Sequence, residues 1–266
     1  MERRTLRTVA VVLLVVVAGC AGFASDEDTS PTDTPTAAVT ATPTETAAPT
    51  PTTPEPERAT YPAGWTDAGV GNTTLALDTH YRAVLAGPSA TVRYRSREVG
   101  SEEGPGNETT LGMTYDTETE RLYASLNGSD DHREVFFADG TLSRWSVRNE
   151  TVVGRSSARF DRVVQSVDRR VLLSQLLLYR LDHDRTVERN GTTAFVYDVT
   201  GVYENALSHT YGSAEAGSGR VVVAESGRVL EVDTTVRYTG GNVTYTYTQT
   251  RLGSTTVDTP AWAQRE

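Results

Sequence analysis

Side chains that commonly do chemistry near neutral pH are few in this chain of 266 residues. The only cysteine is Cys20, and the four histidines are His80, His132, His183 and His209. No two histidines form the H-E-x-x-H or H-x-H spacing that would bind a metal from one element. No serine stands in a G-x-S-x-G turn, and neither a Walker A loop nor a G-x-G-x-x-G loop occurs. The sequence therefore predicts no enzyme activity, no metal and no cofactor.

The densest candidate for a cation or acid–base site is Asp182-His183-Asp184, with Glu188 nearby. We expect this group at the C-terminal end of a long helix, where the helix dipole favours a positive charge on His183. The alternative interpretation is a cation or acid–base site, and a hydrolase would need His183 or His80 to gain a nucleophile that the sequence does not reveal. Asp130-Asp131-His132 lacks the spacing of a calcium loop and is interpreted as a solvated loop.

Cys20 follows a short N-terminal segment with the features of a signal peptide. Three arginines precede an apolar run at residues 9–18, which is too short for a membrane span of about 20 residues. Val17-Ala18-Gly19-Cys20 resembles the lipobox of bacterial and archaeal lipoproteins. This resemblance implies that residues 1–19 are a signal peptide cleaved between Gly19 and Cys20, and that the Cys20 sulfur is lipidated. An uncleaved anchor with a chance cysteine would place the protein at nearly the same location, the extracellular face of the cell membrane.

The start of this segment leaves the export route open. Arg3-Arg4-Thr5-Leu6 partly resembles a twin-arginine signal, but Glu2 stands where Ser or Thr is expected. Because Cys20 is the only cysteine, the exported domain contains no disulfide.

The charged residues are unusual in type. All 25 basic residues are arginine, against 35 acidic residues, which gives a net charge of −10. This composition resembles that of haloarchaeal proteins, whose dense carboxylates keep the surface hydrated in concentrated salt; a mesophilic acidic protein is the alternative. A negative chain without a basic run after residue 20 argues against nucleic acid as a partner, because nothing would neutralise the phosphates.

Residues 20–62 are interpreted as the lipidated cysteine followed by a disordered stalk. Seven of the eleven prolines lie between Pro31 and Pro56, among Thr, Ala and acidic residues. Such a segment buries too little apolar surface to offset its chain entropy. It is either an O-glycosylated stalk or an unmodified linker.

Six of the seven asparagines stand in N-x-S/T sequons, which is typical of exposed positions that accept N-linked glycans. These candidates are Asn72, Asn107, Asn127, Asn149, Asn190 and Asn242. Asn-Gly at two of them also favours a hairpin turn, so occupancy of individual sites stays open.

Residues 63–266 are predicted to form one α+β domain. Thr74 is expected to cap a short helix over residues 75–85, and a long apolar helix over residues 158–181 is expected to be covered on more than one side. Strands are expected at residues 90–99, 109–116, 121–126, 134–138, 141–148, 151–155, 185–189, 193–202, 220–225, 228–238 and 243–252, joined by turns such as Asp139-Gly140.

The last two strands alternate between an apolar and a Thr-rich face. Leu230, Val232, Val236 and Tyr238 are expected on one face, with Val243, Tyr245 and Tyr247 beside them. The sequence therefore predicts a large antiparallel sheet of about 10–11 strands. A sheet this wide is expected to curl into a half-barrel, with the short and the long helix on its concave face.

This order of elements resembles the half-barrel of LolA-like and LppX-like lipoprotein carriers. The lipobox, the stalk and the Tyr61–Trp65 start of the domain also resemble haloarchaeal surface lipoproteins of unknown function. The resemblance implies a cavity for a lipid or another apolar ligand, in a membrane-anchored, non-enzymatic protein of unknown oligomeric state. We expect the cavity to be lined by Leu172, Leu176, Tyr197, Val232, Tyr238, Tyr245 and Tyr247. The alternative is a filled core, with the protein acting as a structural or partner-binding component of the envelope.

Overall fold

The computed structural model describes residues 60–99, 108–128, 132–189, 191–203 and 212–264. The predicted signal peptide and lipid site lie outside these residues, as does nearly all of the predicted stalk. Asn107, Asn190, Asp130-Asp131 and His209 also lie outside them.

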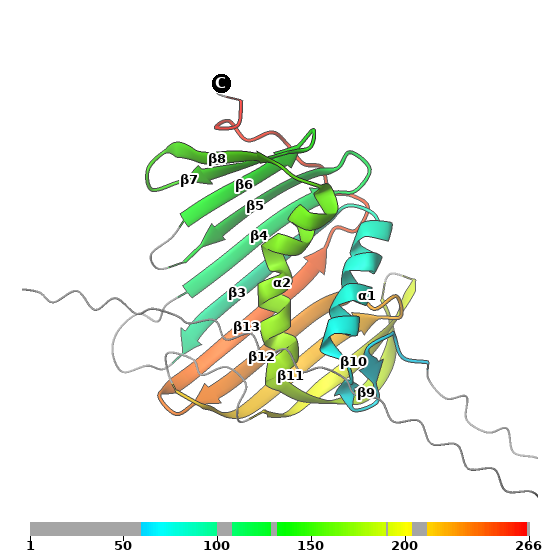
Figure 1. Ribbon diagram of the computed structural model, residues 1–266. Coiled ribbons are helices and arrows are strands. Elements are labelled where there is room, and N and C mark those ends of the chain that lie inside the picture. The colour runs from blue at the N-terminus through cyan, green and yellow to red at the C-terminus, as the bar shows by residue number, and fades with distance from the viewer. Residues whose placement is uncertain (1–59, 100–107, 129–131, 190, 204–211, 265–266) are drawn as a thin grey trace, which may run out of the picture. The chain divides into compact units, whose positions relative to one another are not determined.

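Eleven antiparallel strands form one sheet in the described part of the chain (Figure 1), in the order β8-β7-β6-β5-β4-β3-β13-β12-β11-β10-β9. The strands are β3 (Ala90–Val99), β4 (Glu108–Asp116), β5 (Arg121–Asn127), β6 (His132–Ala138), β7 (Thr141–Ser146), β8 (Thr151–Ser157), β9 (Tyr179–Arg189), β10 (Thr192–Val202), β11 (Ala214–Ala224), β12 (Val229–Tyr238) and β13 (Gly241–Thr250). The predicted α+β class and the large antiparallel sheet are confirmed.

The chain builds this sheet as two runs of hairpins. The turn between β6 and β7 has positive φ at Asp139 and Gly140, at 51° and 71°, as the predicted hairpin requires. β13 then pairs with β3, so the two runs join at the middle of the sheet and leave β8 and β9 as its edges.

One helix connects these two edges. α2 (Phe160–Leu178) begins just after β8, and β9 begins at the residue after α2. Its 19 residues span about 28 Å. Eleven strands spaced by about 4.8 Å would separate the edges of a flat sheet by about 48 Å. The sheet must therefore curl to let α2 join its edges, and its two edge strands are not paired with each other.

α1 (Thr73–Ala86) and α2 lie over the same face of the sheet (Figure 1). The predicted cap of α1 is wrong: Asn72, not Thr74, precedes the helix, and its side chain accepts a hydrogen bond from the Leu75 N–H at 3.0 Å. Asn is among the strongest N-cap residues, and Thr74 falls inside the first turn.

The predicted end of the long helix is also wrong. The helix stops at Leu178, and Tyr179 already pairs with Val202 in the sheet. An apolar run fits a buried helix and a buried strand equally well, so the pattern alone did not separate them.

α2 packs against both the sheet and α1, but it is not covered all the way round. One face is buried, including Val164, Leu172 and Leu176, whereas Leu177 is 44% exposed. The apolar residues on the flanks are half-buried against the sheet.

The face predicted for Leu230 is wrong. Leu230 does not share the apolar face of β12 with Val232, because a bulge after Val222 leaves Leu230 unpaired and puts Val229 on that face. Leu230 packs instead with Val196 and Val222 on the opposite face. The short hairpin of β1 (Trp65–Thr66) and β2 (Gly69–Val70) was not predicted.

The main apolar core lies between the helices and the sheet. A smaller cluster holds the end of the described chain against β6, where Trp262 stacks on Trp145 at 5.7 Å between ring centres. Among the described residues, no helix is both long and apolar enough to cross a membrane.

Candidate functional site

The seven residues predicted to line a ligand cavity all lie in the main core, and each is at most 7% exposed. Tyr238 and Tyr245 share a hydrogen bond of 2.9 Å between their hydroxyl oxygens. None of the seven lines the cavity described below. They fill the space between sheet and helices, and ligand contact at these residues stays a prediction.

Among these apolar residues lies a buried carboxylate that sequence reasoning missed. Asp168 of α2 is 1% exposed and accepts hydrogen bonds from the hydroxyls of Tyr81, at 2.8 Å, and Tyr247, at 3.1 Å. Burial raises the pKa of Asp168 to about 6, although the two hydrogen bonds favour the charged form. Asp168 therefore ties α2 to α1 and to β13.

A second polar group lies between α1 and the turn before β12. His80 is fully buried, and its Nδ1 accepts a hydrogen bond from the Val229 N–H at 3.0 Å. Burial, helped by the nearby Arg228 cation, lowers the pKa of His80 to about 3, so the ring is neutral. Arg228 donates to the Val84 carbonyl and to the Tyr115 hydroxyl. Asp168 and His80 are both closed off from solvent. Their hydrogen bonds therefore hold the core together, and neither group is accessible to a substrate.

The Asp182-His183-Asp184 group does not form a site of the predicted kind. It lies within β9, so the helix-dipole explanation is wrong. His183 contacts the Tyr61 hydroxyl at 3.3 Å and packs on Phe195, while the two aspartates are exposed. Across the described residues, no group of three or more His, Cys, Asp or Glu is placed to hold a metal.

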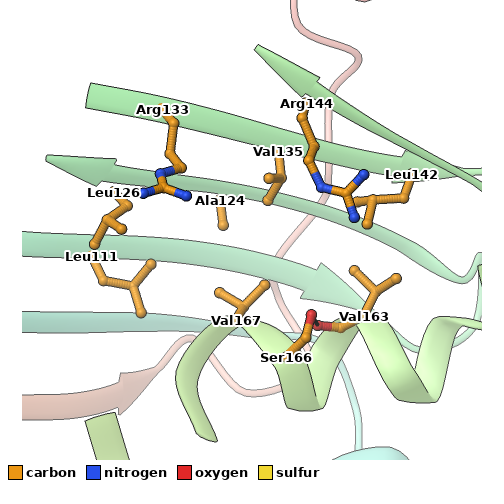
Figure 2. Close-up of a pocket in the computed structure, with 10 residues that line it drawn as sticks. All are labelled: Leu111, Ala124, Leu126, Arg133, Val135, Leu142, Arg144, Val163, Ser166 and Val167. Atoms are coloured by element: carbon orange, nitrogen blue, oxygen red, sulfur yellow. Dashed lines mark hydrogen bonds between the residues drawn. The ribbon is translucent and has the colours of Figure 1, made fainter. Parts of the chain in front are cut away.

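The structure does contain an apolar cavity, between the first half of α2 and the strands β4–β7 (Figure 2). Its volume is about 220 Å³. Seven of its ten lining residues are apolar: Leu111, Ala124, Leu126, Val135, Leu142, Val163 and Val167. The others are Ser166, Arg133 and Arg144.

Two small side chains, Ala124 and Ser166, leave room for the cavity. Ala124 stands at the centre of β5 with Met113 and Val135 beside it on the neighbouring strands. Ser166 faces it from α2 and turns its hydroxyl back to the Val163 carbonyl, at 2.9 Å. No aromatic side chain lines the cavity, in contrast with the tyrosine-filled half of the core.

Two larger hollows have a different chemistry. One of about 470 Å³ is lined by Glu120, Arg159 and Asp161 among others, so it presents charges of both signs. Another of about 540 Å³, beside Thr259, is lined by Arg121, Asp139 and Arg155 among others. The cavity under α2 is therefore the candidate site for an apolar ligand.

Comparison with known proteins gives weak likenesses only. No protein-family model matches the chain, and no curated protein matches it. Among solved structures, the chain is similar to the lipoprotein LppX of Mycobacterium tuberculosis (14% identity, 70% of this chain and 97% of that chain, TM-score 0.33). It is also similar to LprF of Mycobacterium bovis (10% identity, 70% of this chain and 94% of that chain, TM-score 0.34). A third similar structure is a LolA superfamily protein of Nitrosomonas europaea (9% identity, 70% of this chain and 94% of that chain, TM-score 0.27). TM-scores this low carry no argument about function, which must come from the cavity itself.

Proposed function

We propose that this chain is an exported lipoprotein, anchored outside the cell membrane through Cys20, whose folded domain binds a lipid or other apolar ligand without catalysis. The observation that carries this proposal is the cavity under α2, with seven apolar side chains among its ten lining residues. Burial of an alkyl chain against such a lining removes apolar surface from water, which stabilises the complex.

The cavity volume limits the ligand. At about 220 Å³ it lies just below the range of roughly 300–1,000 Å³ that is usual for small-molecule sites. We therefore expect one alkyl chain, or part of one, to occupy it.

α2 offers a route of entry. Its middle is fixed by the hydrogen bonds of Asp168 to Tyr81 and Tyr247. Its first half meets the cavity through Val163 and Val167, which make apolar contacts only. A small outward movement of this half would admit a chain and leave the polar anchor intact.

The location outside the cell rests on the lipobox, the stalk composition and the sequons. The four sequon asparagines that the structure describes, Asn72, Asn127, Asn149 and Asn242, are all exposed. Their exposure supports access by a glycosylation enzyme, and occupancy stays a prediction.

The proposal is tested by native mass spectrometry of the chain without residues 1–19 and with Cys20→Ser, which removes none of the described residues. Protein prepared in high salt is exchanged into a volatile salt immediately before measurement, and a parallel aliquot is extracted with solvent. An added mass of lipid size, recovered in the extract, is expected. Repeated preparations with only the mass of the chain, and no shift of an added fluorescent fatty acid, would overturn the proposal.

A substitution that fills the cavity connects binding to this site. Val167→Phe adds an aromatic ring to the cavity wall from α2, and we expect the affinity for a fluorescent fatty acid to fall by about tenfold or more. Leu177→Phe is the matched control, because it makes the same kind of change at an exposed position of the same helix. Equal binding by both variants would place the ligand elsewhere.

A second candidate function is a ligand-free component of the envelope that binds protein partners. The filled state of the tyrosine-rich half of the core favours it. A chain that carries no lipid in native mass spectrometry, and binds no fatty acid, would support this candidate.

A further inference from the structure

The two charged residues of the cavity stand where the strand pattern calls for apolar ones. Along β6, Arg133, Val135 and Phe137 alternate with residues of the opposite face, and Phe137 and Val135 pack in the main core. Along β7, Leu142 and Arg144 likewise share the face that α2 covers. Arginine thus replaces an apolar residue on two adjacent strands, on the same face.

Both arginines reach toward the helix. Figure 2 shows their guanidinium groups directed from the strands toward α2, beside Leu126 and Leu142 at the cavity wall. Arg144 also donates to the Ser156 hydroxyl, at 3.3 Å. Both residues are exposed, and arginine commonly borders an apolar site with its stem over apolar surface and its charged end in water.

The charge of this wall opposes that of the chain. Acidic residues outnumber basic ones by 35 to 25, yet the ten residues lining the cavity include two arginines and no carboxylate. Arg170 lies on the same helix face as Ser166 and Val167, one turn further along α2, and adds a third cation to this side. A cavity with an apolar wall and a cationic border matches an amphiphile with a negatively charged head.

We propose that the cavity binds a single-chain amphiphile with an anionic head, a carboxylate or a phosphate, and that Arg133 and Arg144 bind the head while the chain lies under α2. This rests on the proposed function. The planar guanidinium groups suit both heads, since each can donate two parallel hydrogen bonds to a carboxylate or phosphate. A cationic or uncharged amphiphile would gain nothing from the two arginines.

The test compares two probes that differ only in head charge. Binding of cis-parinaric acid and of its methyl ester is followed by fluorescence, at the lowest salt concentration at which the chain stays folded, because salt screens the interaction. The wild-type chain is expected to bind the acid about tenfold more tightly than the ester. Displacement of the acid by hexadecanoate and by hexadecyl phosphate then shows which head the site prefers.

The variants separate the head from the chain. Arg133→Gln with Arg144→Gln is expected to reduce the affinity for the acid to that for the ester, and to leave the ester unchanged. Arg93→Gln is the matched control, since Arg93 is an exposed arginine of β3 whose neighbours Val92 and Tyr94 are the ones that pack in the core. This control is expected to keep the wild-type ratio of the affinity for the acid to the affinity for the ester. Thermal midpoints confirm that each variant is folded.

The outcomes distinguish this inference from the function on which it rests. Equal wild-type affinity for acid and ester would overturn the anionic head and leave the apolar site standing. The same conclusion follows if the double variant keeps the preference for the acid. Failure of both probes to bind any folded variant would instead overturn the proposed function.

Discussion

The same sheet face and the same helix form a filled region and a hollow one. Over β9–β13, the second half of α2 packs against tyrosines whose hydroxyls meet Asp168 and one another. Over β4–β7, the first half of α2 faces aliphatic residues and two arginines across a cavity of about 220 Å³. The difference shows that side-chain size and polarity, and not the backbone arrangement, decide which part of this fold is filled and which is hollow.

Truncation of a core residue is expected to give the largest difference in stability between the filled and the hollow region. Tyr247 is fully buried and bonded to Asp168, so we expect Tyr247→Ala to lower the free energy of unfolding by about 3–5 kcal/mol. Val135 is half-buried and already borders a void, so Val135→Ala is expected to cost about 1 kcal/mol. Urea unfolding at one fixed salt concentration measures both.

Tyr247→Phe is the control for this pair, because it keeps the ring and removes only the hydroxyl that donates to Asp168. Its loss in free energy of unfolding is expected to lie between the losses of Tyr247→Ala and Val135→Ala. Equal losses for Tyr247→Ala and Val135→Ala would mean that the two regions are packed alike, and that the cavity closes in solution.

The filled region also contains two groups that titrate with opposite effects. The pKa of Asp168 rises from 3.8 to about 6 on folding, so the folded state holds the extra proton and stability falls as pH rises between 4 and 6. The pKa of His80 falls from 6.5 to about 3, so the unfolded state holds the extra proton and stability rises over the same interval. Each effect is about 1.4 kcal/mol per pH unit, and together they nearly cancel.

Single substitutions should reveal each effect. With Asp168→Asn, the free energy of unfolding is expected to rise with pH between 4 and 6 relative to the wild type. In His80→Gln the side-chain oxygen can still accept from the Val229 N–H. For this variant the free energy of unfolding is expected to fall with pH over the same interval, relative to the wild type. Chemical unfolding at several pH values measures both, and parallel curves for all three proteins would show that neither group has a shifted pKa.

Much of this fold could be predicted from short-range patterns. Alternation along the last two strands and turns such as Asp139-Gly140 identified the hairpins, because each is a property of a few neighbouring residues. The start of β9 was missed because Tyr179 and Leu181 extend the apolar run of α2, and only pairing with β10 shows that they are in a strand.

A cavity was expected from the resemblance, but its position could not be predicted, because it depends on which side chains fail to fill a volume bordered by five elements. Two signals were nevertheless present in the sequence. Arg133 and Arg144 interrupt the apolar alternation of their strands, and Asp168 stands between Val164 and Leu172 on the apolar face of its helix. An ionisable residue on a predicted core face indicates either a buried anchor or the border of a cavity. In this protein Asp168 is a buried anchor, and Arg133 and Arg144 border the cavity.

The smallest expected effect concerns the hollow region itself. Ala124 is buried at the centre of the cavity wall, so Ala124→Leu adds apolar atoms to a space that is already empty. We expect this variant to gain about 1 kcal/mol in free energy of unfolding, where the same change in a filled core would cost 1–3 kcal/mol. It should also bind a fatty acid more weakly than the wild type. Ala76→Leu on α1, at a fully buried position of the filled core, is the matched control and is expected to be destabilised. A gain in stability together with lost binding would show that the cavity is kept open at a cost to the fold, as a binding site requires; a loss of stability at Ala124 would show that the space is not available.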